Sequence, residues 1–191
     1  MKILFTGFAP FDGGTSNPSF DCLRALPGSV DGAELVTLEL PVSFAAGPRV
    51  LLEALEREQP QAVVCLGLAA GRKAITPEKV GINFSNARIP DNDGAQPVHG
   101  TLVEGGPDAF FSTLPLRQLL EVWEQAGIPA ELSCTAGAYV CNSVLYHLMA
   151  WATPRHIPAG FVHVPSRETL PLSEMTRAMV LAAELLVRGR G

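Results

Sequence analysis

Short apolar runs and helical patterns alternate along the whole chain. The apolar runs are rich in branched residues and predict strands at Lys2–Thr6, Glu34–Leu40, Ala62–Leu66, Ala130–Cys134 and Phe161–Val164. Apolar residues at helical spacing predict helices over Phe20–Leu26, over Val50–Glu58, from Pro115 to Gly127, over Cys141–Trp151 and from a cap at Ser173. Such alternation predicts an α/β fold with a mostly parallel sheet and helices on both faces, in a single domain over residues 1–191.

The alternation is interrupted at residues 84–109, which are dense in Gly, Pro, Asp and Asn. A structureless loop of this length is uncommon in a compact domain and usually has a function of its own. Asp93-Gly94 inside it is a hairpin signal. We therefore expect a protruding hairpin around residues 84–109 that covers a pocket or contacts another subunit.

Charge and hydropathy exclude several classes of protein. Of the 191 residues, 47% are hydrophobic and 17% charged, a mixture that can fill a core. The net charge is −5 and the longest cationic cluster is Arg72-Lys73, so we expect no nucleic-acid partner. No apolar run approaches the ~20 residues that span a bilayer, and the first residues are too short for a secretory signal. We expect no membrane association and a cytoplasmic location.

The four cysteines do not follow a metal or disulfide pattern. Their spacing contains no C-x-x-C, and no histidine pair has metal-ligand spacing. Phosphate-binding glycine motifs and the serine nucleophile elbow are also missing from the sequence. We therefore expect neither a metal nor a cofactor, and the thiols remain as the candidate chemistry.

Position along the chain separates the cysteines. Cys65 lies within an apolar strand and Cys22 on an amphipathic helix, so both are expected in the core, while Cys134 closes a strand and fits either use. Cys141 follows the small-residue loop 135–140 and opens a helix. A helix N-terminus stabilises anions and lowers the pKa of a thiol. Cys141 is therefore the candidate nucleophile, with core packing as the alternative.

A thiol nucleophile needs a nearby base, and His163 is the histidine best placed for that role. It lies near the end of an otherwise apolar strand, either as a core histidine bonded to the backbone or as a general base beside Cys141. His147 lies six residues after Cys141 on the same helix and points elsewhere. His99 falls in the long loop and His156 in a surface turn.

A third group should orient the histidine, and the residues alone leave it open. Glu78, Asp91 and Asp93 are the carboxylates outside predicted helices that fit. Taken alone, Glu78 has the pattern of a solvated surface charge.

Six short motifs, in one order, span nearly the whole chain. They are Thr6-Gly7-Phe8-Ala9-Pro10-Phe11 with Asn17-Pro18-Ser19, Gly71-Arg72, Ile75-Thr76-Pro77-Glu78-Lys79-Val80, Ala87-Arg88-Ile89-Pro90-Asp91-Asn92, Thr135-Ala136-Gly137-Ala138-Tyr139-Val140-Cys141-Asn142, and Gly160-Phe161-Val162-His163-Val164-Pro165. Each is weak alone, but together, at matching spacing, they resemble the pyroglutamyl peptidase I (pyrrolidone-carboxylate peptidase) family of cysteine peptidases.

The resemblance implies an activity, a fold and a catalytic triad. The activity is removal of an N-terminal pyroglutamyl residue from peptides through a thioester, without a cofactor. The implied triad is Glu78, Cys141 and His163, which adds the carboxylate that position left open. The implied fold is a three-layer α/β/α domain of the phosphorylase/hydrolase type, in a cytoplasmic homotetramer.

The resemblance also implies roles around the substrate. Arg88 is expected to assist the backbone N–H of Cys141 in binding the oxyanion, with a structural ion pair as the alternative. The expected substrate-binding residues are Phe8, Phe11, Asn17, Leu68, Ile89, Tyr139 and Val140. Asn17 either bonds the pyroglutamyl ring or caps the next helix.

Two positions depart from the family pattern. Leu68 stands where a glutamine is usual, and Ala9 where an aspartate is usual. If the glutamine side chain matters, Leu68 puts recognition of the ring in doubt. The sequence leaves two other functions open: a nucleoside phosphorylase-like transferase, and a ligand-binding protein that has lost turnover.

Overall fold

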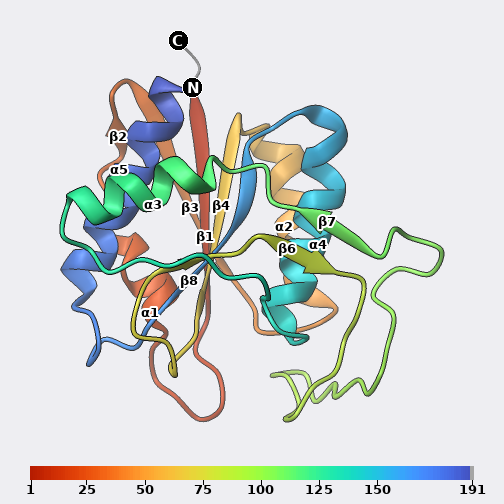
Figure 1. Cartoon of the computed structure of the whole chain (residues 1–191). Helices are drawn as coiled ribbons and strands as arrows, with labels where there is room; N and C mark the ends of the chain where they lie inside the picture. The colour runs from red at the N-terminus through yellow and green to blue at the C-terminus, as the bar shows by residue number, and fades with distance from the viewer. Residues whose placement is uncertain (190–191) are drawn as a thin grey trace.

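The computed structural model describes residues 1–189, which form a six-stranded sheet in the order β2-β3-β1-β4-β8-β5 (Figure 1). The strands are β1 (Lys2–Phe8), β2 (Ser29–Val30), β3 (Ala33–Leu40), β4 (Ala62–Leu68), β5 (Thr76–Pro77) and β8 (Ala159–Val164). The long strands β3, β1, β4 and β8 are parallel, and the short β2 and β5 pair antiparallel at the two edges. The expected mostly parallel sheet is confirmed.

Helices cover both faces of this sheet. Figure 1 shows α1 (Pro18–Asp21), α3 (Leu116–Gln125) and α5 (Leu172–Arg188) on one face, and α2 (Ala46–Glu58) and α4 (Val140–Ala152) on the other. Successive strand residues point to opposite faces, so Ile3 and Phe5 join the core beneath the first group while Leu4 joins the core beneath α2 and α4. This arrangement explains why the central strands are apolar at nearly every position. None of the helices described within residues 1–189 has the length and apolar character to cross a membrane.

Three expected helices differ from the structure. The helix expected from Val50 is α2, which begins at Ala46. α5 begins at Leu172 after Pro171, no side chain caps it, and Ser173 lies inside its first turn. Because the proline ring already holds φ near −65°, the helix starts without a serine cap. The expected helix over Phe20–Leu26 is two short elements, α1 and the 3-10 helix η1 (Leu23–Ala25). A second 3-10 helix, η2 (Thr153–Arg155), follows α4.

The strand expected at Ala130–Cys134 is also wrong. That segment forms only isolated bridges, Ala130 with Ile75 and Ser133 with Glu78. Of its apolar residues, Ala130 is partly buried against the core, but Leu132 is 46% exposed and Cys134 is exposed as well. With so little of its apolar surface buried, the segment gains too little to form a regular strand.

The long excursion is a hairpin only at its base. The strands β6 (Val80–Ile82) and β7 (Ala109–Phe111) pair antiparallel and flank the expected range rather than fill it. Between them, the chain protrudes from the body of the molecule as an irregular loop (Figure 1), with one isolated bridge between Ser85 and Gly100. Side chains organise this loop: the buried Asp91 accepts hydrogen bonds from three backbone N–H groups.

Candidate active site

The site forms where the carboxyl ends of β4 and β8 meet the first turn of α4. In an open parallel sheet this edge is the usual place for a ligand. Gly67 of β4 and His163 of β8 are register partners, so their side-chain directions point to the same face, the face covered by α4. Cys141 is the second residue of α4.

Gly67 makes room for the sulfur. A Cβ at this position would lie 2.9 Å from Cys141 Sγ and 2.7 Å from the ring of Phe161. The sulfur therefore rests against β4, on the sheet face to which the side chain of His163 also points. His163 lies on the neighbouring strand β8, and neighbouring strands are about 4.8 Å apart. The ring of Phe161 packs against that of His163 with 4.9 Å between centroids and holds the imidazole from one side.

Glu78 binds the other side of the histidine. His163 Nδ1 lies 2.7 Å from Glu78 Oε1, and the Glu78 side chain has no exposed surface. A carboxylate on Nδ1 places the ring proton there and leaves Nε2 as the free acceptor. The surface-charge alternative for Glu78 is therefore wrong, and so is the backbone-bonded alternative for His163. Asp91, by contrast, serves the backbone of the long loop.

Burial sets the charge states of Cys141 and His163. Burial lowers the pKa of His163, although the hydrogen bond and charge of Glu78 act in the opposite direction. Burial, followed by the charge of Glu78, raises the pKa of the Cys141 thiol to about 12. The expectation that the helix N-terminus lowers this pKa is wrong, because desolvation of the thiolate outweighs the backbone contribution. Both directions favour a neutral thiol beside a neutral imidazole.

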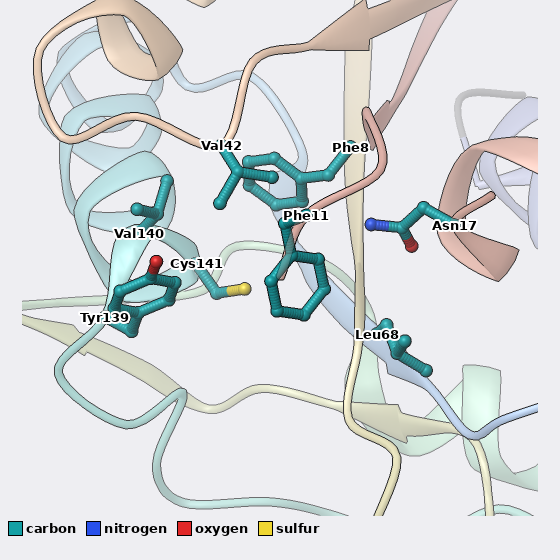
Figure 2. Close-up of a pocket in the computed structure, with 8 residues that line it drawn as sticks. All are labelled: Phe8, Phe11, Asn17, Val42, Leu68, Tyr139, Val140 and Cys141. Atoms are coloured by element: carbon teal, nitrogen blue, oxygen red, sulfur yellow. The ribbon is translucent and has the colours of Figure 1, made fainter. Parts of the chain in front are cut away.

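A small pocket opens at the sulfur. Figure 2 shows the sulfur of Cys141 pointing toward the ring of Phe11. The residues that line the pocket are mostly apolar: Phe8, Phe11, Asn17, Val42, Leu68, Tyr139, Val140 and Cys141. All but Val42 were expected from the sequence. Val42 lies just beyond the carboxyl end of β3, and the rule that ligands bind beyond strand ends would have found it.

Asn17 lies in the wall of this pocket, and its side chain bonds the surrounding chain. The side-chain oxygen Oδ1 accepts hydrogen bonds from the N–H and hydroxyl of Ser19, and the side-chain Nδ2 donates to the carbonyl of Ala9 at 3.0 Å. The capping alternative is thus the one observed. Leu68, at the end of β4, presents an apolar side chain to the same pocket.

Arg88 and Ile89 do not line the pocket at the sulfur. Both are exposed and line a neighbouring hollow, which shares Phe11 and Tyr139 with it. Arg88 forms no ion pair with the other residues of the described part of the chain, so the structural alternative is wrong. Its oxyanion role stays a prediction.

Two residues beside the triad candidates were missed by sequence reasoning. Arg72 donates a hydrogen bond of 2.6 Å to Glu78, and the motif Gly71-Arg72 was its one signal. Asn142, next to Cys141, is fully buried and bonds the backbone of Ile82 and Phe84 at the base of the long loop. Within residues 1–189, no cluster of histidine, cysteine and acidic side chains could hold a metal ion.

The chain is similar to known proteins along nearly its whole length. A family model described as pyroglutamyl peptidase matches residues 1–186. The pyrrolidone-carboxylate peptidase of Bacillus velezensis is 42% identical over 194 aligned residues, which cover 95% of this chain and 90% of that protein.

Solved structures agree with this match. The pyroglutamyl peptidase I of Bacillus amyloliquefaciens superposes with a TM-score of 0.91 at 42% identity, covering 96% of this chain and 93% of that one. The pyrrolidone carboxyl peptidase of Pyrococcus furiosus gives a TM-score of 0.94 at 34% identity, covering 99% of both chains. On the strength of these matches, the chain belongs to the pyroglutamyl peptidase family of cysteine-type peptidases.

Proposed function

We propose that this protein removes N-terminal pyroglutamyl residues from peptides with a catalytic triad of Cys141, His163 and Glu78. The observation that carries the proposal is the 2.7 Å contact between Glu78 and His163 Nδ1, on the same sheet face as the sulfur of Cys141. A thiol, an imidazole and an orienting carboxylate in this order make up the machinery of nucleophilic acyl transfer.

Each step follows from the charge states. As the sulfur of Cys141 attacks the pyroglutamyl carbonyl carbon, its proton passes to Nε2 of His163. The tetrahedral intermediate collapses, the C–N bond breaks, and the imidazolium returns the proton to the departing amine. Water, deprotonated by His163, then hydrolyses the thioester and releases pyroglutamate. Glu78 stabilises the imidazolium that forms in each half of the reaction.

The oxyanion of the intermediate needs donors. The N–H groups in the first turn of a helix lack partners within the helix, and we propose that the N–H of Cys141, the second residue of α4, is the first donor. We propose Arg88 as a second donor, brought from the neighbouring hollow when substrate fills the site.

The pocket suits a lactam. Pyroglutamate has no charged amine, so its ring needs an apolar pocket rather than a carboxylate anchor. Phe8, Phe11, Leu68, Tyr139 and Val140 supply that surface, and we propose that Ile89 closes it from the neighbouring hollow. Because Leu68 offers no amide, we propose that backbone groups bond the ring.

The assembly and location implied by the family are proposals as well. We propose a homotetramer that works in the cytoplasm. An apolar side chain with a large exposed fraction, Val98 at 68%, offers surface for subunit contacts.

The direct test is hydrolysis of pyroglutamyl-aminomethylcoumarin, with the prolyl and alanyl analogues as controls. We expect fluorophore release from the first substrate alone. Prolyl shares the ring but lacks the lactam carbonyl and carries a charged amine, so it reports on the pocket. Equal release from all three substrates, or release from none, would contradict the proposal.

Replacing Phe11 tests the pocket. Phe11→Ala removes an aromatic wall, and we expect kcat/KM to fall about 10- to 100-fold, mostly through KM, because a buried phenylalanine contributes about 1.5–3 kcal/mol. Steady-state kinetics measure the change. Phe111→Ala, at a side chain that is 64% exposed on β7, is the matched control and should leave kcat/KM unchanged. An unchanged KM in Phe11→Ala would remove Phe11 from the pocket.

Replacing Glu78 tests the orienting carboxylate. Burial lowers the pKa of His163, and Glu78 partly offsets this. Glu78→Gln therefore lowers that pKa further below the ordinary histidine value of about 6.5. Since the neutral ring is the base, the acid limb of the kcat/KM profile should move to lower pH, and kcat should fall about 10²- to 10⁴-fold.

The matched control for this variant is Glu34→Gln, at a side chain that is 63% exposed. It should change neither kcat nor the pH of the acid limb of the kcat/KM profile. An acid limb that moves to higher pH in Glu78→Gln would rule out Glu78 as the partner of His163.

A further inference from the structure

Arg72 bonds two of the segments that carry the proposed triad and reaches the third through Thr76. It lies in the loop between β4 and β5, and its Nη1 donates to Glu78 Oε1 at 2.6 Å and to the hydroxyl of Thr76. Its Nη2 donates to the carbonyl of Thr135 at 3.0 Å. Thr135 starts the segment that leads to Cys141, and Thr76 is the register partner of His163. One guanidinium therefore joins Glu78 directly to the segment of Cys141, and indirectly to the strand of His163.

Arg72 also supplies the positive charge that Glu78 needs. The Glu78 side chain is fully buried, and its Oε2 has no hydrogen-bond partner within residues 1–189, so both of its side-chain contacts fall on Oε1. One of them is His163, which burial keeps neutral. A buried carboxylate beside a neutral ring alone is costly. Among the described residues, Arg72 is the cation that contacts it.

We propose that Arg72 is a positioning residue, which holds the carboxylate of Glu78 aligned on His163 and ties Glu78 to the loop of Cys141. Its side-chain hydrogen bonds go to Glu78, Thr76 and Thr135 and not to the sulfur or the imidazole. This inference rests on the proposed function, because it assigns how the orienting carboxylate of that triad is held in its active form.

The proposal fixes the direction of a pH effect. The titratable groups that face each other here are Cys141 from α4, Tyr139 just before it, His163 from β8, Cys65 from β4 and Glu78 after β5, with Arg72 as the permanent cation. The positive charge of Arg72 lowers the pKa of His163. Without Arg72, the ring of His163 therefore takes up a proton at higher pH.

The experiment compares Arg72→Met, Arg72→Lys and wild type. In Arg72→Met, the acid limb of kcat/KM for pyroglutamyl-aminomethylcoumarin should move up by about one pH unit, as expected when a positive charge that disfavours the imidazolium is removed. Arg72→Lys keeps the charge but not the planar fork, so its limb should stay near that of wild type while kcat falls. A merely structural role would lower activity without moving the limb.

A control variant and a second measurement sharpen the test. Arg155→Met removes an arginine that pairs with Glu56 at 3.5 Å and stacks on Trp151, and it should leave the limb unmoved. The rate at which iodoacetamide alkylates Cys141, followed by mass spectrometry, needs no substrate. Its pH profile should also move upward in Arg72→Met, because loss of a cation disfavours the thiolate. Wild type that alkylates at Cys141 but cleaves no substrate would refute the proposed function alone.

Folding is part of the same test. If Arg72→Met does not fold, Glu78→Gln in the same chain should restore folding, because it removes the stranded charge. If Arg72→Met does fold, adding it to Glu78→Gln should cost far less activity than it does in wild type. The proposal is overturned by an unmoved limb in a folded Arg72→Met, by additive losses in the double variant, or by a failure of Glu78→Gln to restore folding.

Discussion

Cys141→Ser is expected to lower kcat/KM for pyroglutamyl-aminomethylcoumarin by about 10⁴-fold or more, the scale seen when a nucleophile is removed from a triad. A hydroxyl holds its proton far more tightly than a thiol does. The base available is an imidazole whose pKa burial has lowered, so it takes that proton poorly. The fold should be unaffected, since oxygen replaces sulfur at a half-buried position.

The other cysteines provide the controls for this experiment. Cys134→Ser, at an exposed position, should keep full activity and full stability. Iodoacetamide should inactivate wild type and Cys134→Ser equally and label the half-buried Cys141, whereas Cys22 and Cys65 have no exposed surface for the reagent to reach. Undiminished cleavage by Cys141→Ser, or inactivation with Cys141 unlabelled, would refute the thiol mechanism.

The second large effect is expected at Gly67, which carries no chemistry. In Gly67→Ala the new methyl group would lie 2.9 Å from Cys141 Sγ and 2.7 Å from the ring of Phe161, closer than real Cβ contacts. The sulfur and the aromatic ring beside His163 must both move. Displacement of reacting groups by about 1 Å costs about 10²-fold, so kcat should fall at least that far. Overpacking should also cost about 1–3 kcal/mol of stability.

Steady-state kinetics and thermal unfolding measure these two losses. Gly71→Ala is the matched control: an added Cβ there meets nothing within 4 Å, and its φ is not in the left-handed region. It should resemble wild type in both measurements. Wild-type kcat in Gly67→Ala would show that the sulfur does not rest against β4 at the moment of reaction.

The sheet was predictable wherever burial alone decides the pattern. Ala62–Leu66 is apolar throughout because β4 is covered on both faces, and so short a run has the length of a strand rather than of a buried helix. The strands β5 and β6 were not predictable. They are two and three residues long, too short to show a period, and their pairing partners are distant in the sequence. Their existence depends on tertiary contacts.

The candidate site likewise contains residues that a local sequence rule can find and one that depends on tertiary contacts. Cys141 and His163 could be singled out because each follows a local rule, a helix start after a small-residue loop and a polar residue in an apolar strand. Glu78 follows none: it is separated by 85 residues from its hydrogen-bond partner, and only the register of β5 against β8 brings the two together. Without that register, its neighbours along the chain resemble those of a surface charge. The family resemblance, rather than residue chemistry, selected Glu78.

The hydrogen bonds of Asn142 fix the base of the long loop to the start of α4. Asn142 lies next to Cys141 and donates to the carbonyls of Ile82 and Phe84, so the same contacts hold the nucleophile and the base of the loop in place. The outer turn around Asp93 and Gly94 is tied to the walls of the pocket instead: Asn92 donates from its N–H to the carbonyl of Val42 and from its side chain to that of Pro10, and the hydroxyl of Tyr139 donates to the carbonyl of Pro90. A change of one residue at the base of the loop is therefore expected to displace the sulfur, while an insertion, deletion or protease cut at the outer turn is expected to displace the walls of the pocket.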